Sequence, residues 1–514
     1  MKITASSSFL CTNGLYTSAL YTSGLYTAEQ VYALDAAAIA SGIPSIQLMK
    51  RAGRAAFELL VERFPAAEQI SIYCGAGKNG GDGYVLAALA AQRLLPVQII
   101  QLTAPEKLTG EARQAYEFAL QEGVPMTPFA QAVAPTTGVI VDALLGIGLR
   151  GAPSDEFAQA IEQINHSRLP VLALDIPSGL NADTGAVAGA AVQASLTLSF
   201  IALKRGLLTG RGAAQSGELV LANLDVPAAT YDAVSPCAER LALSELTELL
   251  APRAADAHKG DFGHVMVIGG DTGFGGAALM AAEAAARTGA GNVSVATRPE
   301  HVAAILARRP EIMACGVVSG QELEPLLTRP TVLVVGPGLG RSPWSEQMLQ
   351  QAVKSGLPLV LDADALNILA EGRVVPAAKH QQHSPWLLTP HPAEAGRLLD
   401  ITTAEVQADR FAAVRALSER YNASVILKGA GSLVAADDGV IGVVTDGNPG
   451  MASGGMGDVL SGILGALMAQ GLTATDAARL GAVVHACAAD LAAEDQGQRS
   501  LLATDLIPYL GQLL

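Results

Sequence analysis

The residues best suited to chemistry lie in a glycine-rich segment near the C-terminal end of the chain. Residues 447–458 read GNPGMASGGMGD and lead directly into an apolar stretch at 459–468. Glycine amides at a helix N-terminus can bind an anion such as a phosphoryl group. Asp458 would lie in the first turn of that helix, where its carboxylate could take a proton from a hydroxyl group. The segment therefore predicts phosphoryl transfer, because an aspartate that only caps a helix does not need so many glycines.

A second glycine-rich segment follows a short apolar run in the first half of the chain. Residues 75–83 read GAGKNGGDG, and their five glycines would let the backbone approach a ligand closely. The helix after them would favour an anion such as a pyrophosphate. The segment is not a Walker A motif, because Asn79 instead of Ser or Thr follows Lys78 and the first glycine is missing. A plain strand-to-helix turn is the alternative, although such a turn needs far fewer glycines.

Two aspartates follow apolar runs that read as strands. Asp142 comes after residues 138–141, and Asp175 comes after residues 171–174. In open α/β sheets, ligands bind outside the carboxyl ends of the strands, so both carboxylates are candidate site residues. Each aspartate alone could equally cap a loop. Each aspartate precedes a glycine-containing loop, at 146–151 and at 176–179, which favours the site. The loop at 146–151 also carries Arg150.

Three segments in the second half of the chain fit the same phosphate site. Residues 336–340 (GPGLG) follow a strand and predict a ligand-facing loop, with an ordinary turn as the alternative. His391 follows another strand and could bind substrate, although a lone histidine is as often structural. Residues 428–432 (KGAGS) link two short strands, and their lysine and amides suit nucleotide phosphates. A tight hairpin is the alternative for this last segment.

Alternating helices and strands would bring these residues to one edge of a sheet. Helices are predicted at 29–40, 46–64 and 84–95, and strands at 69–74, 97–102, 138–141, 171–174 and 196–200. A second pattern begins after residue 255, with strands predicted at 265–268, 292–296, 332–335, 359–361, 386–389 and 424–427. The alternation predicts the α/β class, with parallel sheets covered on both faces.

A break between the two patterns marks a domain boundary. Pro227, Pro236 and Pro252 lie there among Ala, Ser and Asp residues. We expect one domain over residues 25–235 and another over residues 245–514. Residues 1–24 include imperfect repeats such as GLYTS and ALYTS, and we expect them to form a low-complexity, disordered extension.

The composition excludes several classes of protein. The chain has 514 residues, 50% hydrophobic and 16% charged, which indicates a globular protein. Its formal net charge of -15 disfavours nucleic acids and anionic membrane surfaces as partners. No apolar stretch is long enough for a membrane span, and the N-terminus has no apolar core of a signal peptide. The five cysteines form no CxxC pair, so we expect reduced thiols and a cytoplasmic location.

The motifs of the first domain resemble those of NAD(P)H-hydrate epimerases. The resemblance covers residues 27–225 and rests on residues 78–83 (KNGGDG), 141–146 (VDALLG) and 175–179 (DIPSG). It implies a Rossmann-like three-layer fold, and a potassium ion held by Asn79, Asp142 and Ser178, whose oxygens suit a hard cation. It also implies that Asp175 is the acid/base that epimerises the hydroxyl-bearing carbon. The implied contacts of the hydrated dinucleotide are Lys78, Asn79, Gly80, Gly81, Asp82, Gly146, Ile147, Gly148, Leu149, Arg150, Gly151, Ala152 and Asp175.

One position departs from that family. Lys78 stands where these epimerases usually have asparagine, and its cation could face a phosphate.

The motifs of the second domain resemble the ribokinase-like superfamily, and more closely its NAD(P)H-hydrate dehydratase branch. The resemblance covers residues 245–514 and rests on the order of residues 259–264, 269–271, 336–340, 391–392, 428–432 and 454–458. It implies a three-layer α/β/α fold with Asp458 as the catalytic base. The implied contacts with the adenine nucleotide are Lys428, Gly429, Ala430, Gly431, Ser432 and Gly457, and those with the hydrated dinucleotide are Ala277, Gly338, His391 and Asp458.

Together the two resemblances imply a bifunctional isomerase and lyase that repairs hydrated NADH and NADPH. Hydroxide is a poor leaving group, so Asp458 would deprotonate the hydrate's hydroxyl and a nucleotide would phosphorylate it. Loss of phosphate would then restore the ring double bond. Magnesium is expected to bridge the phosphates. The fused architecture favours ADP as the phosphoryl donor, giving AMP and phosphate, although no residue distinguishes ADP from ATP.

Two other functions remain open at the level of sequence. A vitamin-type kinase of the ribokinase superfamily would use the same Asp458, but it would not need the first domain. Alternatively, the first domain could be a binding module without activity, which the presence of Asn79, Asp142, Asp175 and Ser178 disfavours. The expected partners are small molecules, namely hydrated NADH or NADPH and ADP, together with further copies of the same chain in a homo-oligomer.

Overall fold

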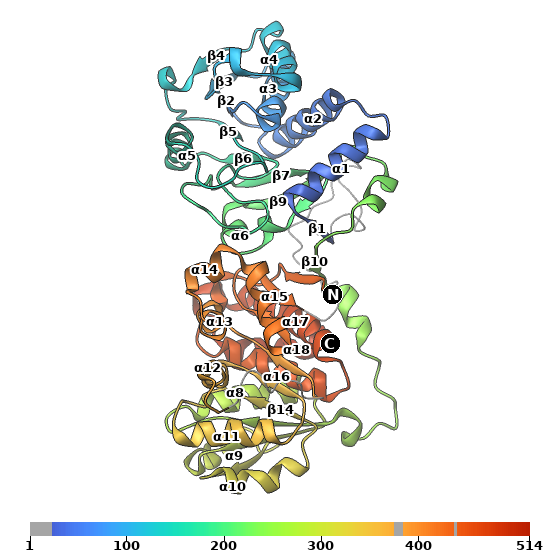
Figure 1. Ribbon diagram of the computed structural model, residues 1–514, viewed down its shortest axis with the longest axis vertical. Coiled ribbons are helices and arrows are strands. Elements are labelled where there is room, and N and C mark those ends of the chain that lie inside the picture. The colour runs from blue at the N-terminus through green and yellow to red at the C-terminus, as the bar shows by residue number, and fades with distance from the viewer. Residues whose placement is uncertain (1–22, 375–383, 436–438) are drawn as a thin grey trace. The chain divides into compact units, whose positions relative to one another are not determined.

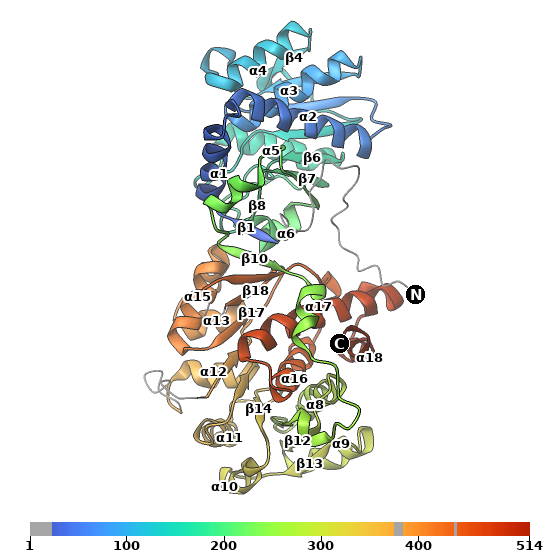
Figure 2. The same ribbon diagram turned by 90° about the vertical axis from the view of Figure 1, so that its right-hand side faces the viewer.

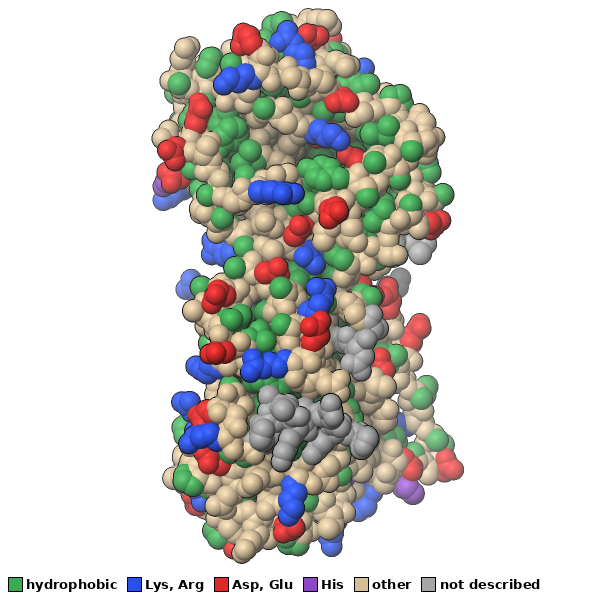
Figure 3. All heavy atoms as spheres, in the orientation of Figure 1, with side chains coloured by type: hydrophobic (Ala, Val, Ile, Leu, Met, Phe, Trp, Pro, Cys, Tyr) green, Lys and Arg blue, Asp and Glu red, His purple; other side chains and the backbone are tan. Residues whose placement is uncertain are grey.

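The computed structural model describes residues 23–374, 384–435 and 439–514, which form two compact units. Unit 1 comprises residues 1–239 and unit 2 comprises residues 240–514. The expected disordered extension lies outside the described residues as far as residue 22. Figure 3 shows acidic and basic side chains interspersed over the displayed face of each unit.

Unit 1 is built on a parallel sheet of seven strands in the order β4-β3-β2-β5-β6-β7-β9 (Figure 1). Its strands are short and, apart from the edge strand β4, almost fully buried, as expected of a sheet covered on both faces. The strand order reverses direction between β2 and β5, which is where doubly wound sheets open a ligand crevice. The strands are β2 (Ile70–Cys74), β3 (Val97–Gln101), β4 (Met126–Pro128), β5 (Val139–Ala143), β6 (Val171–Leu174), β7 (Leu196–Phe200) and β9 (Glu218–Ala222).

Helices cover both faces of this sheet, which completes the expected three-layer, Rossmann-like fold (Figure 1). One face packs against helices α2, α3 and α4, and the other packs against α5. A short strand β1 (Gly24–Tyr26) pairs in parallel with β8 (Leu203–Lys204) and antiparallel with β10 (Ala238–Leu241). The helices are α1 (Ala28–Ala40), α2 (Ser45–Arg63), α3 (Lys78–Gln92), α4 (Gly110–Gln121), α5 (Asp155–Ser167) and α6 (Arg211–Gln215).

The glycine-rich segment after β2 differs from its prediction as a loop. Helix α3 begins at Lys78 and not at Tyr84, so most of the segment is helical. The glycines permit close packing: a Cβ atom on Gly80 would lie 2.1 Å from the carbonyl oxygen of Gly75, and one on Gly83 would lie 2.6 Å from the Cβ of Ala143. The low helix propensity of glycine is therefore offset by contacts that no larger residue could make.

Unit 2 contains a mixed sheet in the order β13-β12-β11-β14-β15-β16-β17-β18-β19. The pairs from β13 to β17 are parallel, and β17, β18 and β19 pair antiparallel. The strands are β11 (His264–Ile268), β12 (Asn292–Thr297), β13 (Met313–Gly316), β14 (Val332–Val335), β15 (Leu359–Leu361), β16 (Trp386–Leu388), β17 (Ser424–Leu427), β18 (Ser432–Ala435) and β19 (Ile441–Val444).

Helices again cover both faces of the unit 2 sheet (Figure 2). Helices α8, α16 and α17 form one layer with a core rich in alanine, and α11, α12, α13 and α15 form the other. The helices are α7 (Leu243–Leu246), α8 (Gly275–Arg287), α9 (Val302–Arg308), α10 (Gly320–Leu323), α11 (Pro343–Lys354), α12 (Ala363–Glu371), α13 (Pro392–Leu399), α14 (Thr403–Ala408), α15 (Arg410–Tyr421), α16 (Met456–Ala469), α17 (Ala474–Gln496) and α18 (Ile507–Leu513).

Within the ranges that the structure describes, no single helix is both long enough and apolar enough to cross a membrane. Helices α1 and α2 reach that length and apolarity only as a pair, across a bend of 116°.

Candidate active sites

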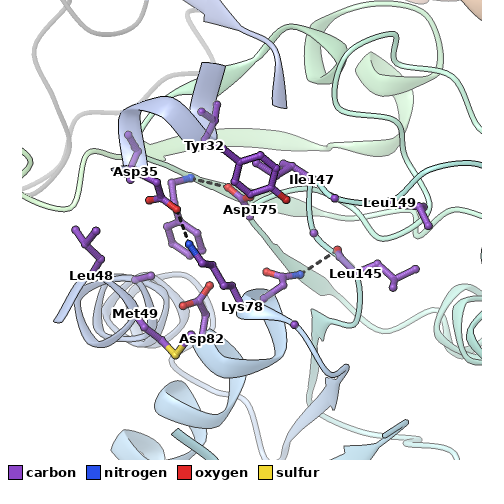
Figure 4. Close-up of a pocket in the computed structure, with 18 of the residues that line it drawn as sticks. Tyr32, Asp35, Leu48, Met49, Lys78, Asp82, Leu145, Ile147, Leu149 and Asp175 are labelled. Carbon is purple, nitrogen blue, oxygen red and sulfur yellow. Dashed lines mark hydrogen bonds and ion pairs between the residues drawn. The ribbon is translucent and has the colours of Figure 1, made fainter. Parts of the chain in front are cut away.

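Unit 1 contains a cavity of about 560 Å³ at the switch point of its sheet (Figure 4). Helices α1 and α2, the start of α3 and the loops after β5 and β6 form its walls. Of the residues predicted to contact the dinucleotide, the following line it: Lys78, Asn79, Asp82, Gly146, Ile147, Gly148, Leu149, Arg150 and Asp175. Gly80, Gly81, Gly151 and Ala152 are not part of this lining, and Gly81 instead packs against Met49.

Asp175 lies at the end of β6 with its backbone in the left-handed region, at φ +65°. Its Oδ1 atom accepts a hydrogen bond from the amide of Phe200 at 3.1 Å and pairs with the ammonium of Lys204. The Lys204 side chain is 0% exposed, and its Nζ also donates to Ser199 Oγ at 3.1 Å and to the Phe200 carbonyl at 3.0 Å. The backbone strain and the buried cation both serve to fix one carboxylate at the cavity wall.

Sequence reasoning missed Lys204. The residue follows the largely apolar run at 196–203 and is itself followed by Arg205, so the local pattern reads as two ordinary charges after a strand. Only the tertiary structure shows that Lys204 is buried with a carboxylate partner.

Asn79, Asp142 and Ser178, the predicted potassium ligands, come together beneath the cavity. Ser178 donates from its Oγ to Asp142 Oδ1 at 2.6 Å and from its amide to Oδ2 at 2.8 Å. Asn79 donates from Nδ2 to the carbonyl of Leu145 at 3.0 Å, and the same carbonyl lies 3.1 Å from Ser178 Oγ. Two separate strand ends and the first turn of α3 thus converge on one point.

The chemistry of this cluster fits a hard monovalent cation. The Oδ1 atom of Asn79 is buried without a hydrogen-bond partner in the described residues. Burial raises the pKa of Asp142 to about 6, despite the hydrogen bonds from Ser178 that lower it. A cation with oxygen ligands would satisfy the amide oxygen and compensate the buried carboxylate.

Beside Lys78, the cavity is lined by two further charged or aromatic side chains, Asp35 and Tyr32 (Figure 4). Lys78 pairs with Asp35 of α1 at 2.9 Å. Tyr32, also on α1, lies so close to Gly148 that a Cβ atom there would be 2.9 Å from the tyrosine hydroxyl oxygen. Asp35 and Tyr32 were not predicted, because α1 carries no motif and reads only as a helix.

In unit 2, Asp458 lies in the first turn of α16, as predicted. The residue that caps this helix is Gly455, at φ +91°, which is a conformation that favours glycine. Burial raises the pKa of Asp458 to about 7, and the negative charge of Asp362 adds to the effect while Lys428 opposes it. A carboxyl group with such a pKa can accept a proton near neutrality.

The end of β15 contributes a carboxylate that sequence reasoning missed. Asp362 is 1% exposed and accepts hydrogen bonds from Lys428 Nζ, Thr389 Oγ1 and Ser461 Oγ, each at 2.8 Å. This network lies directly beneath the first turn of α16, since a Cβ atom on Gly457 would be 3.2 Å from Lys428 Nζ. Asp362 obeys the strand-end rule that identified Asp142 and Asp175, and the rule was not applied to it.

Residues 428–431 form the tight connection between antiparallel strands β17 and β18, and Ser432 is the first residue of β18. The amide of Gly429 donates to Ser432 Oγ at 3.2 Å, and the buried guanidinium of Arg410 donates to the carbonyls of Leu427 and Lys428. The geometry of this segment is therefore that of a tight hairpin. The connection still holds Lys428 beside the start of α16, and Ala430 and Gly431 lie at its tip.

His391 caps helix α13, which is the structural alternative for this residue. Its Nδ1 atom accepts from the amides of Ala393 at 3.1 Å and Glu394 at 3.4 Å, and its Nε2 atom lies 3.1 Å from Glu394 Oε1. The side chain is 47% exposed, so it also presents a surface.

Ala277 and Gly338, two predicted dinucleotide contacts, are neighbours. A Cβ atom on Gly338 would lie 3.1 Å from the Cβ of Ala277. The loop after β14 and the start of α8 therefore meet at this point.

Comparison with known proteins identifies both halves of the chain. A family described as NAD(P)H-hydrate dehydratase matches residues 265–512, and one described as YjeF-related protein N-terminus matches residues 45–206. The bifunctional NAD(P)H-hydrate repair enzyme Nnr of Coxiella burnetii is 48% identical over 485 residues, which cover 94% of this chain and 98% of that protein. The enzyme of the same name from Escherichia coli is 42% identical over 473 residues, covering 92% and 90%.

A solved structure is also similar to part of the chain. The ADP/ATP-dependent NAD(P)H-hydrate dehydratase from Bacillus subtilis, co-crystallized with ATP/Mg2+, is 25% identical with a TM-score of 0.48. The match covers 53% of this chain and 96% of that one.

Proposed function

The chain belongs to the family of bifunctional NAD(P)H-hydrate repair enzymes, and on that premise we propose a division of labour between its two units. Unit 1 interconverts the R and S hydrates of NADH and NADPH. Unit 2 converts the S hydrate to NAD(P)H, with ADP as phosphoryl donor and AMP and phosphate as products. The two activities belong together because hydration gives both epimers, whereas the dehydratase uses one.

The dehydration is carried by Asp458. Its carboxylate takes the proton of the hydrate's hydroxyl, and the hydroxyl oxygen attacks the terminal phosphorus of ADP, with AMP as leaving group. The new phosphate ester then leaves as phosphate while the neighbouring ring carbon loses a proton, which restores the double bond. The single observation that supports this role best is the position of Asp458 in the first turn of a glycine-capped helix, where burial raises its pKa to about 7.

Magnesium, when bound, neutralises charge on the transferring phosphates. Such a site needs few protein ligands, because Mg²⁺ is held largely by phosphates and water. The described residues of unit 2 contain no cluster of three or more His, Cys, Asp or Glu side chains that could hold a metal ion by itself. Lys428 and the connection that follows it would lie against the nucleotide phosphates.

In unit 1, Asp175 is the proposed acid/base, and the cavity beside it holds the hydrated nicotinamide ring. Asn79, Asp142 and Ser178 would hold a potassium ion, which offers positive charge to the substrate's oxygens. The start of α3, with Lys78, would face the pyrophosphate.

The proposed setting is the cytoplasm. The cysteines among the described residues, Cys74, Cys237, Cys315 and Cys487, are free thiols, as a reducing compartment favours. Homo-oligomeric assembly stays a prediction.

The test uses the full chain with separated R and S hydrates. With ADP, the wild-type protein should regenerate NADH from both hydrates. Without any nucleotide it should interconvert them and produce no NADH, as chromatography of the two hydrates would show. Faster regeneration with ATP than with ADP would overturn the choice of donor. Failure to consume either hydrate, together with phosphorylation of a free alcohol, would overturn the function in favour of a kinase.

A further inference from the structure

We propose that epimerisation in unit 1 uses two carboxyl groups of opposite protonation state, Asp175 as carboxylate and Asp82 as carboxylic acid, and that Lys204 is a positioning residue for Asp175. The inference rests on the proposed epimerase function of unit 1. It adds to that function a proton donor (Asp82), a proton acceptor (Asp175) and a residue that holds the acceptor in place (Lys204).

The ammonium of Lys204 makes all of its hydrogen bonds within the wall of the cavity. An ammonium has three donors, and Asp175 Oδ1, Ser199 Oγ and the Phe200 carbonyl accept all three. Burial of an ammonium is unfavourable unless a paired charge and hydrogen bonds compensate it. Lys204 therefore forms an ion pair with the Asp175 carboxylate.

The two oxygens of Asp175 are used differently. Lys204 Nζ and the Phe200 amide both donate to Oδ1. No donor in the described part of the chain reaches Oδ2, and Asp175 lines the cavity. Oδ1 thus anchors the group, and Oδ2 remains for a proton from the substrate side.

Asp82 has the opposite surroundings. It is 7% exposed, lies in the second turn of α3 and lines the same cavity. Within the described residues it forms no salt bridge, unlike Asp175 with Lys204 and Asp35 with Lys78. Burial raises the pKa of Asp82 well above its usual value, and the charges of Asp175 and Asp35 raise it further, while the charges of Lys78 and Lys204 lower it.

The two carboxyl groups reach the cavity from separate elements. Figure 4 shows Asp82 on α3 near Met49, and Asp175 on the side of Tyr32 and Ile147. Inversion at a carbon requires that one group leave from one face of the ring and another arrive at the other face. Two carboxyl groups on different walls meet this requirement, as two carboxyl groups do in inverting glycoside hydrolysis.

The reaction balances without a further reagent. The hydroxyl-bearing carbon is bonded to the ring nitrogen, whose lone pair expels the hydroxyl group as Asp82 protonates it. This breaks the C–O bond and gives water, a C=N double bond with a positive charge on the ring, and the Asp82 carboxylate. Water then adds to the opposite face of that carbon and gives its proton to Asp175. The other epimer reacts by the reverse sequence, and proton exchange with solvent resets the pair.

The first test is Asp82→Asn in the full chain. Loss of the donated proton should slow interconversion of the separated hydrates about 100-fold or more. ADP-dependent use of the S hydrate, which occurs in unit 2, serves as the folding control and should stay at the wild-type rate. Interconversion at the wild-type rate in Asp82→Asn would overturn the role of Asp82, whereas a wild-type chain that fails to interconvert the hydrates would overturn the epimerase function itself.

The second test concerns the path of the oxygen atom. In water labelled with heavy oxygen, each inversion should introduce one solvent oxygen into the hydrate, as mass spectrometry would show. Inversion without incorporation of label would overturn the exchange of water and favour opening of the ring at the C–N bond.

The third test compares Lys204→Met with Lys204→Arg and with Arg63→Met. Arg63 pairs with Glu218 at 2.5 Å outside the cavity, so its loss removes an ion pair of unit 1 without touching the site. Lys204→Met should lower kcat for interconversion about tenfold or more with a smaller change in KM. Lys204→Arg should recover part of kcat, and Arg63→Met should retain it. Equal loss in Lys204→Met and Arg63→Met, or a change in KM alone, would assign Lys204 to folding or binding and overturn its positioning role.

Discussion

The two units each place a reactive aspartate near a lysine, but they use the lysine differently. In unit 1, Lys204 pairs with the reactive Asp175 itself. In unit 2, Lys428 pairs with a neighbour, Asp362, at 2.8 Å, and Asp458 is left with a pKa of about 7. One arrangement fixes a charged carboxylate, and the other keeps a carboxyl group ready to exchange a proton near neutrality. The partner of the lysine, and not the type of the reactive residue, therefore distinguishes the two chemistries.

The largest expected effect is a loss of dehydration in unit 2 with no change of interconversion in unit 1. Asp458→Asn removes the base that activates the hydroxyl, so dehydration of the S hydrate should fall about 1000-fold. Interconversion of the hydrates in unit 1 should continue at the wild-type rate. The measurement is NADH formation with ADP beside chromatography of the hydrates, and full turnover by the amide variant would remove Asp458 from the mechanism.

The second prediction breaks the lysine pair of unit 2. Lys428→Met leaves the buried Asp362 without its cation, which should lower the free energy of unfolding by about 3 kcal/mol and abolish most dehydration. Denaturant unfolding followed alongside activity checks this. The double variant Lys428→Met with Asp362→Leu removes both charges and should recover stability but not dehydration. If Lys428→Met is as stable as the wild type, the pair does not have the role assigned to it.

The third prediction sharpens the difference in cation use. Interconversion should depend on potassium, and dehydration in unit 2 should not depend on Asn79 or Asp142. Asn79→Ala should reduce interconversion at least about tenfold. Mutation of residues that only hydrogen-bond to metal ligands already causes a loss of that size. The assay replaces potassium by tetramethylammonium at constant ionic strength. An Asn79→Ala chain with undiminished dependence on potassium would place the ion elsewhere.

The fourth prediction is the pH dependence of dehydration. A base with a pKa of about 7 is protonated below that pH, so kcat/KM for the S hydrate should rise with pH up to about 7 and then level. On the acid side the slope should be roughly tenfold per pH unit. Burial is the main cause of the raised pKa, with Asp362 next, while the charge of Lys428 lowers it. A profile that is flat through neutrality would contradict the assignment.

The smallest expected effect is a loss of stability on removal of a helix cap. It should be equal in the two units, because the caps take no part in either reaction. Thr27 and Thr402 cap helices α1 and α14 with the same box, in which each threonine oxygen accepts from an amide at 3.2 Å. Thr27→Ala and Thr402→Ala should each lower the free energy of unfolding by about 1 kcal/mol. Both activities, assayed in the folded protein, should be unchanged.

Much of the fold was predictable, because buried parallel strands carry a strong local signal. Strands β6, β7, β14, β15 and β17 lie where the apolar runs placed them. The start of α3 was not predictable from propensity, since its glycines read as a loop and only their contacts with Gly75 and Ala143 make the helix favourable.

The site was predictable where motifs follow strands, and incomplete where a residue acts through tertiary contacts. The cluster of Asn79, Asp142 and Ser178 assembles as expected. Lys204 was missed because its partner Asp175 lies 29 residues away along the chain and Arg205 beside it hides any local signal. Asp362 follows strand β15 and was predictable by the strand-end rule, although its pairing with Lys428, 66 residues away, was not.

The left-handed backbone of Asp175 also bears on how unit 1 can be engineered. Glycine would adopt this conformation without strain, but Asp175→Gly would leave the buried ammonium of Lys204 without its carboxylate. The cost of that unpaired charge exceeds the strain that glycine would relieve. A more heat-tolerant unit 1 would therefore need Asp175 and Lys204 to be replaced together.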